Sequence, residues 1–414
     1  MKMDDGLPRR SIIYYHPTYM ITSEKFPVDK TPQTDFSQVP SPCFVLEERL
    51  LRYNLQVLRH VMDEAGCEII CALKGFAMWS TFPLVREYLP GGTASSLHEA
   101  KLIWEEMGVK AHLTAPAYRE EDWPELEQIC SHIVFNSLNQ WNQYKERALA
   151  AGISCGIRVN PQYSEVEVDL YNPCIPGSRL GTTANHIGEQ LAEGMEGVHF
   201  HTLCENNADA LERTFKAVED RFGPLLHQAK WLNLGGGHHI TRDDYDIDRL
   251  IALIKYIKEK YDVHVILEPG EAVGWQTGYL RAKVLDIMDS QGINVIVMDA
   301  SVSAHMPDCI EMPYKPKILG ADDAPQSGRT NNEVAPWRVG GGTCLAGDFV
   351  GDYQFEKEPQ IGDALIFNDM IHYTMVKTTN FNGVQLPSIG IWKEDNNFKL
   401  VKSFGYESYK GRLS

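Results

Sequence analysis

Several residues that can do chemistry stand at or near the ends of short apolar runs. Lys74 ends EIICALK, His201 lies in GVHFHT, and Glu268 lies in HVILEPG. Another run, WLNLGGG, ends in three consecutive glycines, Gly235, Gly236 and Gly237. The backbone N–H groups of glycine can approach the oxygens of a phosphate closely. Because a lysine amine forms a Schiff base with an aldehyde, the lysine and the glycines together indicate an aldehyde ligand that carries a phosphate.

The elements that must position these residues follow an alternating pattern. Eight β-prone runs occur at 68–74, 91–96, 111–116, 132–137, 156–161, 197–202, 231–237 and 264–270. Stretches with apolar residues at helical spacing separate them, for example 244–261. Eight strands with intervening helices predict a (β/α)8 barrel, which we place at residues 42–278. One connection, 161–187, is long and rich in Pro, Gly, Tyr and Asn, and we expect this insertion to serve the active site.

A barrel brings the carboxyl ends of its strands to one face, so the pattern predicts which side chains converge. Arg158, on the fifth strand, joins Lys74, His201 and Glu268 there. The glycines after the seventh strand, with Gly270 after the eighth, occupy the usual phosphate position of this fold. Pyridoxal 5'-phosphate carries both an aldehyde and a phosphate, and its ring needs an anion beside the pyridine nitrogen. We therefore predict a pyridoxal 5'-phosphate site in which Lys74 forms the Schiff base and Glu268 is the anion.

The pattern changes after about residue 279 to strands without regular helices. The strand-like runs are 279–289, 294–301, 363–369, 386–393 and 398–404. A second, mostly β domain is therefore expected at the C-terminus. We assign residues 1–41 and 279–414 to it.

Composition excludes several classes of function. The formal net charge of −17 opposes binding to nucleic acid or to an anionic membrane and favours a cationic ligand. Nine cysteines without a C-x-x-C pair argue against a disulfide framework and a structural zinc site. No run of about 18 apolar residues occurs, and the N-terminus is polar, so we expect a cytoplasmic protein.

The motifs resemble those of the fold-type III pyridoxal-phosphate decarboxylases, whose barrel is of the alanine-racemase type. The resemblance spans nearly the whole chain and rests on CALKGF, GIRVNP, GVHFHTL, LNLGGGHH and LEPGEA in the barrel, and on MDASVSAHMPD, GGTCLAGDFVGDYQ and NDMIHYT after it. Within that family the chain is most similar to the carboxynorspermidine and carboxyspermidine decarboxylases. The run EVEVDLYNPCIPGSRLG, which contains Arg179, is the strongest indication of this branch.

The resemblance implies roles for particular residues. It implies that Lys74 holds the cofactor, that Arg158 lies behind the ring and that His201 stacks on the pyridine face. Tyr373 would hydrogen-bond the cofactor phosphate. Cys344 is the candidate acid that protonates the α-carbon after carbon dioxide leaves.

The resemblance also implies a homodimer, because the sites of this family lie at a subunit interface. Cys344 and Asp348 would then enter the active site of the other subunit. The implied reaction is the decarboxylation of carboxynorspermidine or carboxyspermidine to norspermidine or spermidine.

Two positions depart from the better-known relatives and bear on specificity. Relatives commonly have an arginine directly after Glu-Pro-Gly, where this chain has Glu271, and many have an acidic residue where it has Leu345. A substrate with two positive charges beyond the reacting carbon needs carboxylates in its pocket. Glu271, Asp299 and Asp348 are the candidates, and Arg179 in the insertion is a further candidate substrate contact.

Four other functions stay open from the sequence. The first is decarboxylation of diaminopimelate or another basic amino acid on the same fold. An amino-acid racemase and a non-catalytic pyridoxal-phosphate carrier are the second and third. The fourth is a metal hydrolase that binds zinc through four histidines, His199, His201, His238 and His239.

Overall fold

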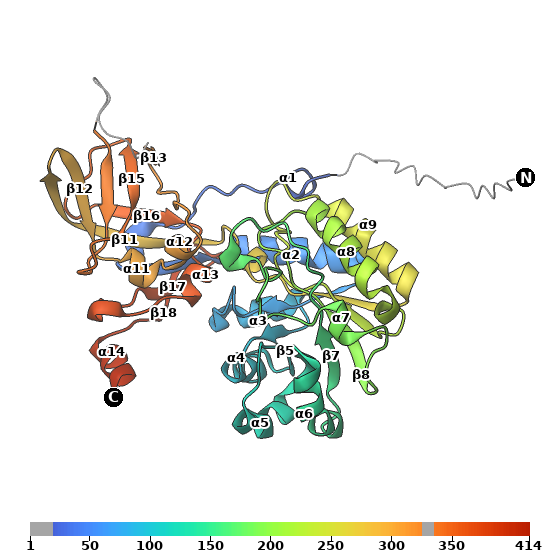
Figure 1. Ribbon diagram of the computed structural model, residues 1–414. Helices are drawn as coiled ribbons and strands as arrows, with labels where there is room; N and C mark the ends of the chain where they lie inside the picture. Colours follow the sequence, from blue (N-terminus) through green and yellow to red (C-terminus); the bar gives the residue numbers. More distant parts are fainter. Residues whose placement is uncertain (1–19, 325–334) are drawn as a thin grey trace, which may run out of the picture.

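A computed structural model of the chain describes residues 20–324 and 335–414. These residues form two sheets, each with its own set of strands (Figure 1). The first sheet is parallel, and its order is β2-β10-β9-β8-β7-β6-β5-β4-β3. Its strands are β2 (Glu68–Ile69), β3 (Cys71–Ala72), β4 (Gly92–Ala94), β5 (Ala111–Thr114), β6 (Cys130–Phe135), β7 (Ser154–Arg158), β8 (Met195–His199), β9 (Trp231–Asn233) and β10 (His264–Leu267).

The parallel sheet closes into a barrel through its first strand. β2 and β3 are two halves of one predicted run, interrupted at Ile70. β2 pairs with β10, whereas β3 pairs with β4, so this run joins both edges of the sheet. All eight predicted runs contain barrel strands, and the (β/α)8 prediction is confirmed.

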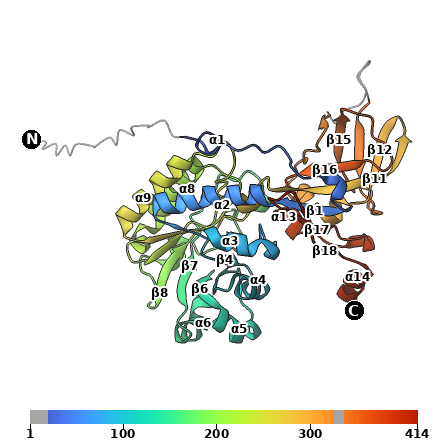
Figure 2. The same cartoon turned by 180° about the vertical axis from the view of Figure 1, so that it is seen from behind.

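Helices cover the outside of the barrel (Figures 1 and 2). They are α2 (Glu48–Ala65), α3 (Phe82–Tyr88), α4 (Leu97–Leu102) with a π-helical turn at Ile103–Met107, α5 (Trp123–Ile129), α6 (Leu138–Ala150), α8 (Ala208–Leu226) and α9 (Ile247–Tyr261). Short helices α7 (Ala184–Ile187) and α10 (Glu271–Gly274) lie in loops.

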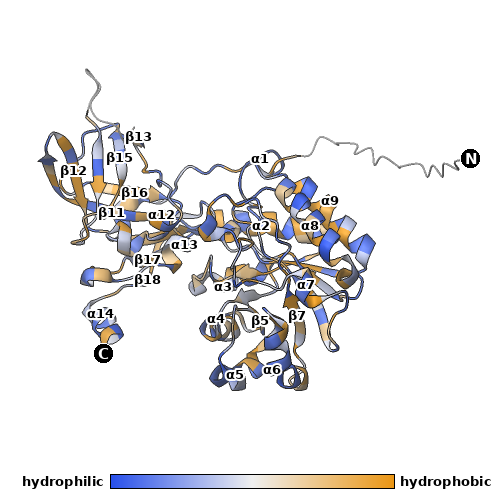
Figure 3. Ribbon diagram, viewed as in Figure 1, coloured by the Kyte–Doolittle hydropathy of each residue, from blue (hydrophilic) through white to orange (hydrophobic). Residues whose placement is uncertain are grey.

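The helix α9 illustrates why these segments are helical. Its buried residues recur at a spacing of three or four and face the core, namely Ile247, Leu250, Ile251, Leu253, Ile254, Ile257 and Tyr261. The Asp246 side chain accepts a hydrogen bond from the Arg249 backbone and caps the first turn. Hydrophilic and hydrophobic residues alternate along α8 and α9 in Figure 3, as expected for helices with one face in water.

The second sheet lies to one side of the barrel (Figures 1 and 2). Its order is β13-β15-β14-β12-β11-β1-β17-β18, and β16 also pairs with β11. Its strands are β1 (Cys43–Glu47), β11 (Gly278–Ser290), β12 (Ile293–Met298), β13 (Ala321–Asp323), β14 (Trp337–Gly340), β15 (Phe349–Phe355), β16 (Ala364–Asn368), β17 (Ser388–Trp392) and β18 (Phe398–Lys402). The helices of this part are α11 (Val302–His305), α12 (Asp308–Glu311), α13 (Tyr373–Val376) and α14 (Tyr406–Leu413).

Two segments differ from the expected division of the chain. We placed residues from 42 onward in the barrel, but β1 pairs with β11 and β17 of the second sheet. Residues 20–31, which we placed in the β domain, instead carry α1 (Thr22–Lys25) and hydrogen-bond the barrel at Asp243 and Tyr245. The rest of that expected N-terminal part, residues 1–19, lies outside the described residues.

In residues 20–324 and 335–414, no helix is both long and apolar enough to span a bilayer.

Candidate active site

A cavity of about 240 Å³ opens at the carboxyl ends of the barrel strands. Lys74, His201, Gly236 and Glu268 line one part of it. A second cavity, of about 410 Å³, shares Lys74 and His201 with the first and is otherwise lined mainly by the insertion, residues 169–180, and by Arg158. The strand ends therefore bring together the side chains that the sequence predicts, and the insertion borders the site as expected.

Lys74 lies in the turn that follows β3, with its amine in the cavity. Its Nζ is 3.0 Å from Nε2 of His201. Burial lowers the pKa of the Lys74 amine, and the nearby Arg158 guanidinium lowers it further. Burial also lowers the pKa of His201 well below its usual range. A lowered pKa favours the neutral lysine amine, and the neutral amine is the form that attacks an aldehyde.

Glu268 is a buried anion at the end of β10. Its Oε1 accepts a hydrogen bond of 2.7 Å from Asn233, and its Oε2 is 3.6 Å from Nε2 of His199. Burial alone would raise the pKa of Glu268, but the contacts with His199 and Asn233 lower it to about 2. The carboxylate is therefore ionised at neutral pH and can stabilise a proton on a ring nitrogen.

The three glycines after β9 pack closely against neighbouring backbone, and Gly236 and Gly237 line the cavity. Gly235 and Gly237 have φ of +69° and +82°, values that disfavour other residues. A Cβ on Gly236 would lie 2.6 Å from the carbonyl oxygen of Glu268. Across the barrel closure, a Cβ on Gly75 would lie 2.8 Å from Cα of Gly270. Because these distances are too short for a Cβ atom, both positions require glycine.

The positions of the glycines, Lys74 and Glu268 fit pyridoxal 5'-phosphate. The cofactor needs a phosphate cradle, an amine for its aldehyde and an anion for its ring nitrogen, and one cavity contains all three. Asn233 links two of these parts, because it donates to Glu268 and its Oδ1 accepts from the Gly235 backbone (2.8 Å).

Comparisons with known proteins agree with this arrangement. Residues 18–371 match the family model described as "Pyridoxal-dependent decarboxylase, C-terminal sheet domain". The chain belongs to the pyridoxal-dependent decarboxylases. The predicted cofactor and the carboxy-lyase class are thereby confirmed, and the racemase and the non-catalytic carrier are set aside.

This decarboxylase has close relatives of known name. It is 48% identical to carboxyaminopropylagmatine decarboxylase of a Synechocystis species, over 91% of this chain and 96% of that one. It is 42% identical to the carboxynorspermidine/carboxyspermidine decarboxylase of Campylobacter jejuni, over 91% of this chain and 99% of that one. The crystal structure of the carboxynorspermidine decarboxylase from Campylobacter jejuni in complex with norspermidine superposes with a TM-score of 0.83 and 41% identity, covering 90% of this chain and all of that one.

The far end of the decarboxylase cavity is acidic, and sequence reasoning identified only one of its residues. Glu271 was expected there, whereas Glu205 and Asp308 were missed. His239 Nε2 lies 3.7 Å from Glu271 Oε1. Burial and the nearby Glu271 carboxylate raise the pKa of Glu205. Glu205 and Asp308 lie outside the predicted strands, so periodicity gave no signal for either of them.

Glu271 is held between two buried histidines. Besides His239, the ring of His372 places Nδ1 3.9 Å from Glu271 Oε1 and Nε2 3.2 Å from Asp369. Burial alone would raise the pKa of Glu271, but the two histidines lower it. Burial alone would lower the pKa of His372, but Asp369 and Glu271 raise it to about 9. A cationic His372 thus compensates the carboxylate that stands where relatives have an arginine.

Tyr373 and Arg179 each border one of the two cavities, and their roles stay predictions. Tyr373, at the first position of α13, lines the cavity together with Gly236 and Gly237. Arg179 is exposed and lines the second cavity. Arg158 is buried and donates from Nη2 to the carbonyl of His201 (3.1 Å).

Three predicted residues of the second domain lie outside both cavities of this chain. The thiol of Cys344 is exposed and donates to Asn382 Oδ1 (2.8 Å). Asp299 accepts from the Lys283 backbone (2.7 Å) and from Ser41. Asp348 is buried, and its two oxygens accept hydrogen bonds from Ser301, Val302, Ser303 and Thr343.

The hydrogen bonds of Asp348 correct the expectation that it binds substrate, because no oxygen is left free for an ammonium group. The structure also does not bring together the four histidines of the zinc hypothesis, because only His239 belongs to a possible metal group among the described residues. Among the described residues, the one group that could hold a metal is Glu205, His239 and Glu271. His201 contacts Lys74, His199 contacts Glu268, and His238 contacts the Leu234 carbonyl instead.

Proposed function

We propose that this decarboxylase removes the α-carboxylate of carboxynorspermidine or carboxyspermidine and releases norspermidine or spermidine. One observation carries the proposal: the cavity that contains Lys74 also contains Glu205, Glu271 and Asp308. Such a substrate has a secondary and a primary amine beyond the reacting carbon. Glu205 and Glu271 offer carboxylates for these charges, whereas Asp308 is paired with Lys377 of the same cavity. The names of the relatives that are 42% and 34% identical support the same substrates.

The residues of the cavity have distinct roles in the proposed reaction. Bound pyridoxal phosphate supplies an electron sink for the carbanion that remains when carbon dioxide leaves. Lys74 holds the cofactor, and Glu268 keeps a proton on the pyridine nitrogen. His201, which contacts the backbone of Gly236 and the amine of Lys74, would contact the cofactor ring. Tyr373 and the glycines Gly235 to Gly237 hold the phosphate.

The proposed active unit is a homodimer. The Cys344 side chain is exposed and does not line the cavity that contains Lys74 of its own chain. This is expected of a residue that serves another subunit. In the dimer its thiol would deliver the proton to the α-carbon of the substrate bound by the partner.

A second candidate substrate is carboxyaminopropylagmatine. The Synechocystis relative named for it is 48% identical to this chain. That substrate ends in a guanidinium group instead of an amine, and a guanidinium prefers two carboxylate oxygens in one plane. Glu205 and Glu271 are placed for such a contact, because a carboxylate oxygen of one lies within 4.8 Å of a carboxylate oxygen of the other.

Carbon dioxide release by the purified holoenzyme from a substrate panel tests the proposal. The panel contains carboxynorspermidine, carboxyspermidine, carboxyaminopropylagmatine, ornithine, lysine, arginine and meso-diaminopimelate. We expect kcat/KM for a carboxylated triamine to exceed that for ornithine by about a hundredfold or more, because unpaired carboxylates disfavour the shorter amino acid. Highest activity on ornithine or diaminopimelate would refute the proposal. A clear preference for carboxyaminopropylagmatine would establish the second candidate.

A further inference from the structure

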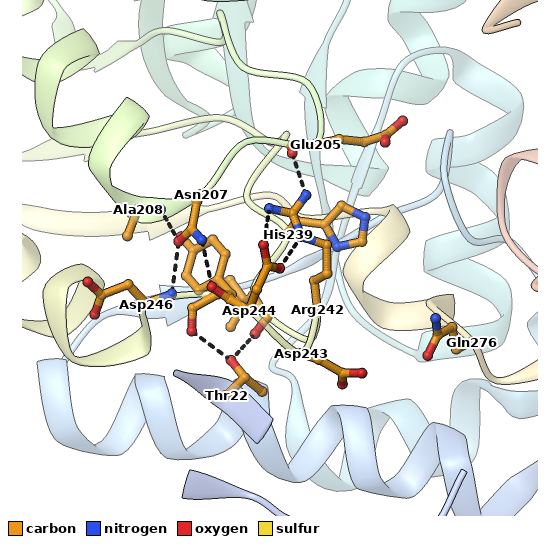
Figure 4. Close-up of polar contacts among 12 residues, drawn as sticks. Thr22, Glu205, Asn207, Ala208, His239, Arg242, Asp243, Asp244, Asp246 and Gln276 are labelled. Carbon is orange, nitrogen blue, oxygen red and sulfur yellow. Dashed lines mark hydrogen bonds and ion pairs between the residues drawn. The ribbon is translucent and has the colours of Figure 1, made fainter. Parts of the chain in front are cut away.

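The N-terminal strap, residues 20–31, lies across the outside of a loop that borders the active site. Thr22 is completely buried, and its Oγ1 donates to the carbonyls of Ile240 (2.8 Å) and Tyr245 (3.2 Å). The backbone N–H of Thr22 donates to Tyr245 (2.8 Å), and that of Ser23 donates to Asp243 (3.0 Å). Figure 4 shows Thr22 on one side of this loop and Glu205 on the other.

Ion pairs extend the attachment of the strap. Lys30 Nζ lies 2.6 Å from Asp243 and 2.9 Å from the side-chain oxygen of Gln276, which follows α10. Lys25 pairs with Asp248 in the first turn of α9. Because partly exposed ion pairs contribute little, the buried Thr22 is the main anchor.

The loop under the strap, residues 238–246, which we call the bracing loop, continues directly from the glycine cradle. It carries His239, which lines the cavity beside Glu271. From the same loop, Arg242 Nη1 donates to the Glu205 carbonyl (2.8 Å) and Thr241 Oγ1 donates to the Ala272 carbonyl (2.7 Å). The bracing loop is therefore bonded to the loop that carries Glu205, as Figure 4 shows for Arg242. It is also bonded to the helix that begins at Glu271.

The acidic end of the cavity depends on the spacing of these loops. Glu205, His239 and Glu271 come from three different loops, yet their ligand atoms lie within 4.8 Å of one another. Two carboxylates this close repel each other, so the loops that carry them tend to move apart unless they are held. The strap contacts the bracing loop on the face away from the cavity and opposes that movement.

We propose that the strap positions the substrate-amine end of the cavity, with Thr22 as the positioning residue that fixes the bracing loop and thus the spacing of Glu205, His239 and Glu271. This inference rests on the proposed function, because it assigns those three residues to the distal charges of the substrate. It predicts that the strap affects binding of the polyamine portion and leaves the chemistry at Lys74 unchanged.

The test is Thr22→Val in the full-length holoenzyme, since valine keeps the shape and removes the hydroxyl. We expect KM for carboxynorspermidine to rise about three- to tenfold, with kcat within twofold and the visible absorbance of the bound cofactor unchanged. Thr22→Ser restores the hydroxyl and should restore KM. Thr31→Val is the matched control, because Thr31 is exposed on the same strap and does not contact the bracing loop.

A wild-type KM in Thr22→Val enzyme would overturn the positioning role. If thermal stability or cofactor content were lost while KM stayed at the wild-type value, Thr22 would be a merely structural contact. Lys30→Met, at a partly exposed position, supplies a variant that does not disturb the core, and we expect a smaller rise in KM. Failure of the proposed function can be distinguished from failure of the positioning role. If the proposed function were wrong, wild-type enzyme would not turn over carboxynorspermidine. KM would then be measured with the preferred substrate.

Discussion

Replacement of Glu268 by glutamine tests the charge on which the proposed decarboxylation depends. Glu268 is 7% exposed, and its pKa of about 2 lies below the ordinary 4.5. A difference of this size corresponds to about 3 kcal/mol in favour of the anion. Glutamine has the same size and can still accept the hydrogen bond from Asn233. The variant therefore removes the charge and leaves the shape of the site nearly intact.

We expect Glu268→Gln to lower kcat by about a hundredfold or more. The reason is that the variant removes the negative charge that would stabilise a proton on the pyridine nitrogen, and a hundredfold loss corresponds to about 2.7 kcal/mol in the transition state. The assay is carbon dioxide release at saturating substrate, with cofactor content measured by absorbance so that turnover is expressed per loaded site. A decrease of less than about tenfold, or ~1.4 kcal/mol, would refute the assigned role.

Glu68→Gln is the matched control for this variant. Glu68 also pairs with a histidine, because His264 Nε2 lies 3.2 Å from its Oε2, and this hydrogen bond lowers the pKa of Glu68. Glu68 is the first residue of β2, and His264 is the first residue of β10. The pair therefore lies at the amino ends of the barrel strands, opposite the active site. Its kcat should equal that of the wild type. Equal losses in both variants would point to a general disturbance of the barrel.

Three further predictions concern the assembly, the specificity and the pH dependence of the protein. Lys74→Ala and Cys344→Ala enzymes should each be nearly inactive, but mixed dimers contain one intact site, so mixing should recover up to about a quarter of the wild-type activity if subunits exchange at random. No recovery after subunit exchange is verified would contradict a shared site. Glu271→Arg should raise KM for the carboxylated polyamine at least about tenfold at low salt. The reason is that the arginine would repel the substrate's ammonium groups, whereas Glu271, which lies beside His239 and His372, attracts them. An unchanged KM would remove Glu271 from the substrate site. The raised pKa of His372, about 9, means that its contribution to stability is complete below the unfolded value near 6.5 and is lost as pH rises through 9. The difference in melting temperature between the wild type and His372→Gln should therefore shrink between pH 7 and pH 10, and a constant difference would show that His372 is not cationic.

The barrel could be predicted because its strands are buried on both faces. Each then reads as a short apolar run whatever its neighbours are, and the runs follow one another in chain order around the barrel. The strand β1 shows the limit of this signal. CFVLE is entirely buried, but its partners are Gly278–Ser290 and Ser388–Trp392, far away in the chain. Nothing within the run indicates that it belongs to the second sheet.

The same distinction holds for the site. Lys74, His201 and Glu268 stand at strand ends, so the topology alone brings them together. Glu205 reaches the cavity from a loop and Asp308 reaches it from the second domain, where position in the chain does not determine position in space. His372, also from the second domain, is buried beside Glu271. Asn233 was detectable in principle, since a polar residue inside the apolar run WLN must find a buried partner.

Asp348, which we expected to bind substrate, has other contacts in the structure. Its carboxylate accepts hydrogen bonds from the backbone N–H groups of Val302 (2.7 Å) and Ser303 (3.0 Å) at the start of α11. It also accepts from the N–H (3.0 Å) and the hydroxyl (2.6 Å) of Thr343, the residue before Cys344. Burial alone would raise the pKa of Asp348, but these hydrogen bonds lower it, so the carboxylate stays charged and keeps all of its donors. Asp348 therefore fixes the loop that presents Cys344 at the surface. In the proposed homodimer Asp348 would act on the partner's site indirectly, through the direction of that thiol.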